Sequence, residues 1–227
     1  MRMIVTFEKG EGIRFIGHLD LMRTMQRALR RSGLPLSFSK GFNPHIRLSF
    51  AVPLSVGVVG LRELMDVPLS GEISPEDFSA GLKGVLPPPI QVKDCSLVPD
   101  DFPSLMSLVA GADYTIRMAE EDVARLAPFL EGFLAQEEIT SERTTKSGTK
   151  DTDLKPFIRY ASLGREGIAF GSAANANGML KPSLFLQALC DFAQMECPPY
   201  VAYREAILSR NQKGELVPME ELTWVKR

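Results

Sequence analysis

The order of secondary structure that the sequence predicts is the feature that most limits its fold. In the first half, the apolar residues Ile4 and Val5 have polar neighbours in alternation, which is typical of a strand. After this strand, apolar side chains recur at helical spacing. Short strand-like stretches, a second helix and a further strand follow. We expect these elements at residues 1–9, 18–32, 34–40, 45–54, 61–69, 75–86 and 90–98.

The second half repeats this order of elements without repeating the sequence. It begins with a strand and a long helix, in which Pro128 predicts a bend. Two strands around a polar loop, a strand that pairs back as a hairpin, another helix and a last strand complete the half. We expect them at residues 112–118, 119–138, 139–145, 155–163, 165–173, 181–195 and 200–210, with the polar loop at 146–153.

Strand–helix–strand–strand–helix–strand, twice in succession, is the order of a ferredoxin-like (βαββαβ) unit in tandem. The sequence therefore predicts an α+β protein with antiparallel sheets, one unit in residues 1–100 and the other in residues 105–227. The acidic, proline-containing stretch 98–105 marks the boundary. Both helices of such a unit cover one face of its sheet, so we expect the other face to be available, as it is in many RNA-binding sheets.

Capping signals place the two helices of the first half. Gly17 and Gly33 bracket the first helix, and Asp20 lies in its first turn, where the helix dipole favours a carboxylate. Ser74 is a preferred N-cap residue, and Pro75 is suited to the first helical position. These signals predict where both helices begin.

The composition is that of an ordinary globular protein. Of the 227 residues, 44% are hydrophobic and 24% are charged, which is enough apolar surface to form a core. The longest apolar run, residues 50–61, includes Pro, Ser and Gly and is much shorter than the ~20 residues that a membrane helix needs. The first ten residues are too polar for a signal peptide. We therefore expect a cytoplasmic protein with no membrane partner.

Three cysteines, Cys95, Cys190 and Cys197, are widely spaced and form no CxxC pair. Zinc sites and iron–sulfur clusters are usually marked by closely spaced cysteines. We therefore expect reduced, mostly buried thiols, no bound metal and no cofactor.

Positive charge is concentrated at the start of the chain. Residues 1–50 hold nine Lys/Arg and three Asp/Glu, a net charge of +6, whereas the remaining residues carry −8. Both histidines, His18 and His45, also lie in this basic segment. Such an asymmetry indicates an anionic partner, although a solvated helix face is often basic as well.

The first helix has two faces at 100° per residue. Leu21, Met25, Ala28 and Leu29 form an apolar face, and four arginines lie together on the other side. The arginine face is either plainly solvated or a phosphate-binding surface, since guanidinium groups bind phosphate oxygens in pairs. The turn "GFNP" and a His–x–Arg pair follow soon afterwards. The candidate nucleic-acid-binding residues are Arg14, Arg23, Arg27, Arg30, Arg31, Lys40, Asn43, His45 and Arg47.

The two histidines support a second hypothesis. One imidazole can remove the proton from a ribose 2′-hydroxyl while the other protonates the leaving oxygen, so His18 and His45 are candidate catalytic residues of a metal-independent endoribonuclease. A packing role for His18 and a polar turn role for His45 are the simpler alternatives. The basic stretch 144–155 is a further candidate surface, unless it is an ordinary hairpin loop.

One segment carries a family resemblance. "RFIGHLDLMRTMQRALRRSGLPLSFSKGFNPHIRLSFAVPLSVGV" (14–58) resembles the bacterial radical-SAM-linked proteins, a domain family of unknown function. The pattern F-x-x-H-L-D-L-x-R is matched from Phe15 to Arg23, and the GFNPH-x-R motif from Gly41 to Arg47. "DLKPFI" (153–158) and "MLKPSLFLQAL" (179–189) match less specifically.

The resemblance implies a partner. In this family the domain stands beside, or is fused to, a radical-SAM protein with a cobalamin-binding-like region, near genes for ribosomal proteins and an RNase. The resemblance thus implies a non-catalytic accessory that binds RNA, ribosomal or transfer RNA, or presents a substrate to that enzyme. The chain itself lacks the three-cysteine cluster motif of a radical-SAM enzyme. The endoribonuclease, and a protein–protein adaptor that never contacts RNA, are the alternatives.

Overall fold

The computed structural model describes residues 1–145, 148–164, 166–176 and 178–222, and the side chains of residues 142–150 lie outside that description. The protein is α+β with mostly antiparallel strand pairs, as the sequence predicts. It divides into two compact units. The first comprises Met1–Val109 together with the residues from Ala206 onward, and the second comprises Ala110–Glu205.

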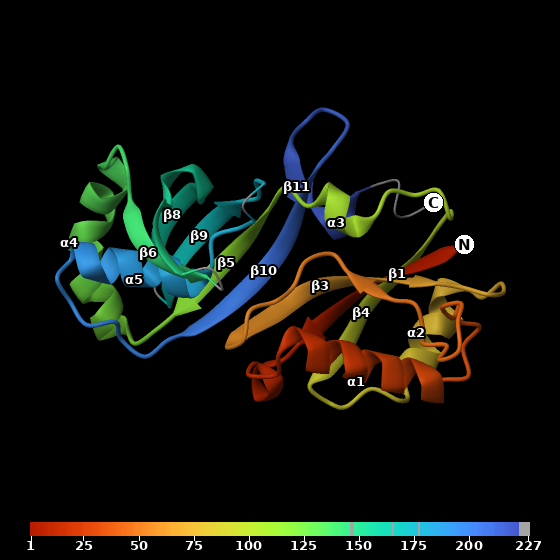
Figure 1. Cartoon of the computed structure of the whole chain (residues 1–227). Helices are drawn as coiled ribbons and strands as arrows, with labels where there is room; N and C mark the ends of the chain where they lie inside the picture. Colours follow the sequence, from red (N-terminus) through yellow and green to blue (C-terminus); the bar gives the residue numbers. More distant parts are fainter. Residues whose placement is uncertain (146–147, 165, 177, 223–227) are drawn as a thin grey trace. The chain divides into compact units, whose positions relative to one another are not determined.

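Among the described residues, the first unit contains three helices, five whole strands and the end of a sixth (Figure 1). Its elements are β1 (Arg2–Lys9), α1 (His18–Arg31), β2 (Ser49–Phe50), β3 (Val58–Pro68), α2 (Pro75–Lys83), β4 (Ile90–Val98), α3 (Leu105–Leu108), the end of β10 (Val201–Arg210) and β11 (Leu216–Pro218). Strand β1 is central, with β4 on one side and β3 on the other, and β2 pairs with β3. The register places Val5 opposite both Met65 and Cys95.

Helices α1 and α2 begin where their capping residues predict. Gly17 is the N-cap of α1, and Gly33, with a φ of +70°, lies just beyond its end. The Ser74 hydroxyl accepts a hydrogen bond from the backbone N–H of Asp77 at 3.0 Å, and Pro75 is the first residue of α2. The residues of α1 that are buried are those of the predicted apolar face, Leu21, Met25, Ala28 and Leu29.

The sheet of the first unit is buried on both faces. One face packs against α1 and α2 through alternate residues of β1, such as Val5 and Phe7. The other face, including Ile4 of β1, packs against α3 and β11, which Figure 1 shows on the side of the strands away from α1. Phe102, Leu105 and Met219 lie in this second core. The sheet face that the sequence predicted to be open is therefore covered in this unit.

The second unit has two helices that pack against a four-stranded sheet (Figure 1). Its elements are β5 (Gly111–Arg117), α4 (Glu120–Ala135), β6 (Thr140–Thr145), β7 (Gly148–Asp153), β8 (Ile158–Gly164), β9 (Gly167–Ala173), α5 (Pro182–Phe192) and the beginning of β10. The strand order is β10-β5-β9-β8, and β6 and β7 form a separate pair. Stacked rings of Tyr114, Phe170 and Phe185 lie in its core.

Three local predictions differ from the structure. The polar segment 146–153 was expected to be a loop, but Gly148–Asp153 is strand β7, paired with β6. In the first unit, the strands expected at 34–40 and 45–54 are reduced to β2 and to isolated bridges such as Phe38 with Ile46. Short 3-10 turns, Glu11–Ile13, Lys155–Phe157 and Met219–Glu221, were not foreseen.

The observed division of the chain also differs from the expected ranges 1–100 and 105–227. The segment 99–109 belongs to the first unit, and so do the residues from Ala206 onward. The physical reason is the second core of the first unit, which takes apolar side chains from α3, the end of β10 and the turn Met219–Glu221. Among the described residues, no helix is both long enough and apolar enough to span a membrane.

Candidate nucleic-acid interface

A basic groove lies between α1 and the segment that contains His45 in the first unit. It has a volume of about 170 Å³. Three arginines of α1 line one wall, and side chains of the hairpin formed by residues 37–47 line the opposite wall. The lining residues are Arg23, Gln26, Arg27, Arg30, His45 and Ile46. The amide of Gln26 donates a hydrogen bond to the carbonyl oxygen of Ile46 at 3.2 Å, which fixes α1 to the opposite wall.

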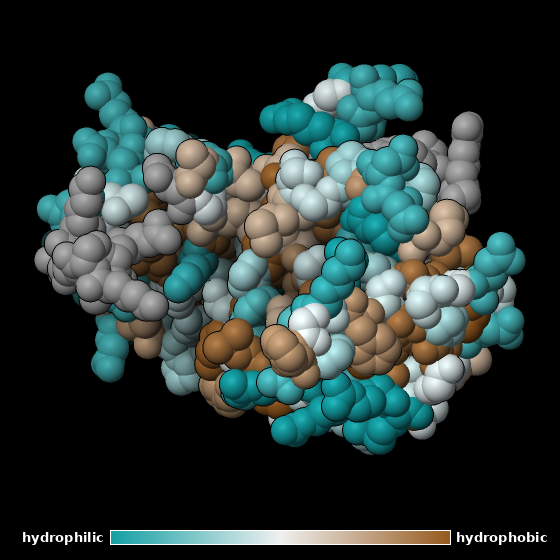
Figure 2. Space-filling view, turned by 45° about the vertical axis from the view of Figure 1, so that its right-hand side comes forward, coloured by the Kyte–Doolittle hydropathy of each residue, from teal (hydrophilic) through white to brown (hydrophobic). Residues whose placement is uncertain are grey.

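Two of these arginines are available for a ligand. Arg23 forms an ion pair with Asp20 at 3.1 Å, one turn earlier in the helix. Arg27 and Arg30 are exposed, and no carboxylate of the described residues pairs with them. An exposed guanidinium without a carboxylate partner can bind a phosphate oxygen without breaking an existing ion pair. Figure 2 shows hydrophilic side chains gathered along the lower edge of this unit, over α1.

A larger groove of about 700 Å³ adjoins the first one through His45, Gln26 and Ile46. Arg47 is an exposed cation on its wall. Arg2 and Asp66 also line it, but they are held together: the guanidinium donates to both carboxylate oxygens, with Nε at 3.1 Å from each. This hydrogen bond with Asp66 raises the pKa of Arg2 above its usual value. Arg2 is therefore a structural cation, whereas Arg47 is open to solvent.

A hairpin forms the second wall of the basic groove. The backbone N–H of Ser39 donates to the carbonyl of His45 at 2.8 Å, and that of Arg47 donates to the carbonyl of Ser37 at 3.0 Å. The Ser39 hydroxyl lies 2.8 Å from Nδ1 of His45 and accepts from the His45 backbone N–H at 3.1 Å. His45 thus closes the hairpin. The two residues of the His–x–Arg pair after the turn have different positions: His45 fixes the hairpin, and Arg47 lines the larger groove.

His18 lies apart from this arrangement. It is the first residue of α1, it is half-buried, and its ring packs edge-on against Phe50 with the ring centres 5.4 Å apart. His45 lines both grooves and His18 lines neither. The structure therefore gives His18 the packing role and does not bring the two imidazoles to one groove.

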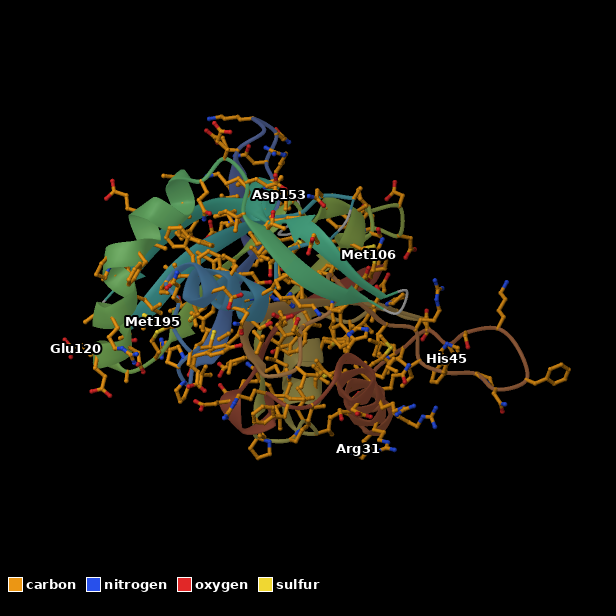
Figure 3. All side chains as sticks on the ribbon, turned by 60° about the vertical axis from the view of Figure 1, so that its left-hand side comes forward. Arg31, His45, Met106, Glu120, Asp153 and Met195 are labelled. Carbon is orange, nitrogen blue, oxygen red and sulfur yellow. The ribbon has the colours of Figure 1, made fainter. Side chains whose placement is uncertain are left out.

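The other candidate residues have separate positions. Arg14 stacks over the ring of Phe15 and pairs with Glu11 at 3.3 Å. Arg31 donates to the carbonyl of Val85 at 2.8 Å, and Figure 3 shows it well apart from His45. Neither arginine lines the two grooves.

Lys40 and Asn43 are exposed in the tip of the hairpin. The basic stretch 144–155 falls partly on residues 146–147 and on the side chains of 142–150, which are outside the described part of the chain.

The three cysteines are free, and two of them are buried. Burial raises the pKa of the Cys95 thiol to about 11 and that of Cys190 to about 12. No group of three or more His, Cys, Asp or Glu side chains suited to a metal ion occurs among the residues that the structure describes.

Sequence reasoning missed several residues of the site. Gln26 and Ile46 join the two walls of the basic groove, and Arg2 and Asp66 lie 64 positions apart in the chain. One signal was readable: residues 21–62 contain seven Lys/Arg and no Asp or Glu. This acid-free stretch covers α1 from Leu21 onward and the whole hairpin.

The family assignment rests on most of the chain. A family model described as "Uncharacterized protein conserved in bacteria (DUF2344)" matches residues 2–182. The chain belongs to this family. The description agrees with the expected domain of unknown function. No curated protein matches the chain.

In this DUF2344 protein the matched region includes α1, the hairpin and both grooves. The arrangement offers exposed guanidinium groups, an exposed lysine and an imidazole that is already engaged in a structural hydrogen bond. Such groups bind phosphate oxygens well.

Proposed function

We propose that this protein is a non-catalytic accessory that binds single-stranded RNA through the basic groove and works with a radical-SAM enzyme. The observation that supports RNA binding most directly is that Arg27 and Arg30 lie exposed beside His45, with no described carboxylate paired to them. The phosphates of a single strand would contact these arginines, and Arg47 and Lys40 would extend the path along the hairpin.

We also propose that each unit is ferredoxin-like. The strand order β4-β1-β3-β2 in the first unit and β10-β5-β9-β8 in the second supports this, because each order places the first strand of a βαββαβ unit between its third and fourth strands. The covered sheet face of the first unit then accounts for a ligand surface on α1 and the hairpin instead of on the sheet.

The arrangement of histidines favours binding over cleavage. General acid–base cleavage needs two groups within reach of one ribose-phosphate. His18 packs against Phe50, while Nδ1 of His45 is engaged with Ser39, and only His45 lines the grooves. We therefore expect intact RNA after incubation with the purified protein in EDTA, and efficient cleavage would revive the endoribonuclease hypothesis.

RNA binding can be tested by fluorescence anisotropy with a labelled 12-nucleotide single-stranded RNA. Changing Arg27 and Arg30 to Gln should raise the Kd more than tenfold, because two phosphate contacts are lost. The matched control changes Lys83 and Arg125 to Gln; both are exposed and outside the two grooves, and the net charge changes equally. If both double variants raise the Kd equally, only net charge matters, and the proposal that RNA binds in the basic groove is wrong.

The enzyme partner can be tested separately. The radical-SAM link rests on the motif resemblance in residues 14–58, so the experiment is an anaerobic co-purification from native cells, which preserves an iron–sulfur cluster. Recovery of a radical-SAM enzyme would support the accessory role. If the protein binds RNA but no such enzyme is recovered, RNA binding is supported and the accessory role is wrong.

A further inference from the structure

The tip of the hairpin carries an exposed aromatic ring. Phe42 is fully exposed (107%), while Ile46 at the base of the same hairpin is buried (1%). Most large apolar side chains are at least partly covered, because each exposed ring forgoes the free energy of burial. Among the described residues Phe42 is the most exposed large apolar side chain, so its ring gains no burial from the packing of the unit.

The hairpin is firmly anchored, so the ring is presented on a fixed support. Ser37 bonds to the end of β3, with its backbone N–H at 2.9 Å from the carbonyl of Pro68 and its hydroxyl at 2.9 Å from that of Leu69. The Ser39–His45 hydrogen bonds close the hairpin above this anchor. Figure 3 shows the loop standing out from the unit beyond His45.

The turn itself does not need an aromatic side chain at this position. Gly41 has a φ of +128°, a conformation that favours glycine, and Pro44 restricts the return of the chain. These residues account for the shape of the tip. Phe42 adds apolar surface to the tip without contributing to its shape, so the ring is accessible to a ligand.

The charge around Phe42 identifies the kind of ligand. Lys40, His45 and Arg47 lie within five residues of Phe42 in the sequence. The acid-free stretch 21–62 also includes Arg27 and Arg30, which line the basic groove. A pocket on a protein partner can also take an aromatic anchor, but it does not require a row of cations around that ring. An aromatic ring beside a row of cations is instead the combination that binds single-stranded nucleic acid, with bases stacked on rings and phosphates on cations.

We propose that Phe42 stacks on an unpaired base of single-stranded RNA while the arginines of the groove hold the adjacent phosphates. This proposal rests on the RNA-binding function proposed above and adds a preference for single strands, because the base faces of a duplex are already stacked. The hairpin of residues 37–47 is thus the part of the surface that distinguishes an unpaired strand from a duplex.

The test compares wild type, Phe42→Ala and Phe42→Tyr on three probes: a 12-nucleotide oligoadenylate, an abasic oligomer of the same length, and a 12-base-pair RNA duplex. Phe42→Ala should weaken oligoadenylate binding about 5- to 150-fold, the range for one stacked base. Phe42→Tyr should stay close to wild type. The abasic oligomer and the duplex should bind all three proteins alike, since neither offers a free base face.

A direct readout comes from Phe42→Trp combined with Trp224→Phe, which leaves one tryptophan. Its fluorescence should be quenched by oligoadenylate and unchanged by the abasic oligomer. Stacking is refuted if Phe42→Ala binds oligoadenylate as wild type does, or if it loses equal affinity for the abasic probe. Loss of anionic-vesicle binding with RNA binding kept would assign Phe42 to a membrane surface instead. If wild type binds none of the RNA probes, the proposed function fails together with this inference.

Discussion

Removing the carboxylate of Asp66 should destabilise the first unit strongly. The side chains of Arg2 and Asp66 are only 12% and 6% exposed, so their ion pair is largely shielded from water. Asp66→Ala leaves the guanidinium buried beside Phe102 without its carboxylate, and breaking a buried pair in this way costs about 3–5 kcal/mol. The carbonyl of Phe102 still accepts a hydrogen bond from Arg2, which favours the lower end of that range.

Urea denaturation followed by far-UV circular dichroism measures this loss. The control is Asp20→Ala, which removes a pair whose side chains are 65% and 66% exposed and should cost no more than about 1 kcal/mol. The double change Arg2→Met and Asp66→Leu should recover much of the stability, because no unpaired charge remains. If Asp66→Ala unfolds at the same urea concentration as Asp20→Ala, the pair is not a buried structural one and Arg2 belongs with the cations of the groove.

Two further predictions concern the helices and the thiols. Ser74→Ala removes the hydrogen bond that the Ser74 hydroxyl accepts from the backbone N–H of Asp77, and it should lower the free energy of unfolding by about 1 kcal/mol. Ser74→Thr keeps a hydroxyl at the N-cap and should retain most of this stability. An unchanged urea midpoint for Ser74→Ala would show that the cap contributes nothing. Burial raises the pKa of Cys95 to about 11, so at pH 8 its thiolate is scarce in the folded protein. Iodoacetamide should therefore alkylate Cys95 at least ~100-fold more slowly in buffer than in urea, as measured by peptide mass spectrometry, and equal rates would contradict its burial.

Local patterns predicted the elements whose stability is local or strongly periodic. The buried face of α1, with Leu21 and Met25, follows from helical spacing alone, and the start of α2 follows from Ser74 and Pro75. Strand β7 was missed because its residues are polar, so pairing with β6 holds it in place without an apolar alternation. The covered sheet face was missed because it depends on packing with residues far away in sequence, such as Met219.

The site was predictable in part for the same reasons. The helical spacing of the arginines predicted the arginine face of α1, and the residues GFNP predicted the turn before His45. Which arginines face His45 depends on the hydrogen bond from Gln26 to Ile46, and this excludes Arg31 from the groove. The exposure of Phe42 runs against the usual burial of aromatic residues, so no sequence rule indicated it.

The salt dependence of RNA binding measures how many phosphates the protein contacts. Each phosphate contact with a single strand contributes about −0.7 to the slope of log K against log salt concentration. Log K for wild type should fall linearly with log salt concentration, and the slope should be less steep by about 1.4 when Arg27 and Arg30 are both changed to Gln. The double change of Lys83 and Arg125 should leave the slope as it is. If the slope for the Arg27 and Arg30 variant equals that of wild type, these arginines contact no phosphate and the basic groove is only a solvated surface.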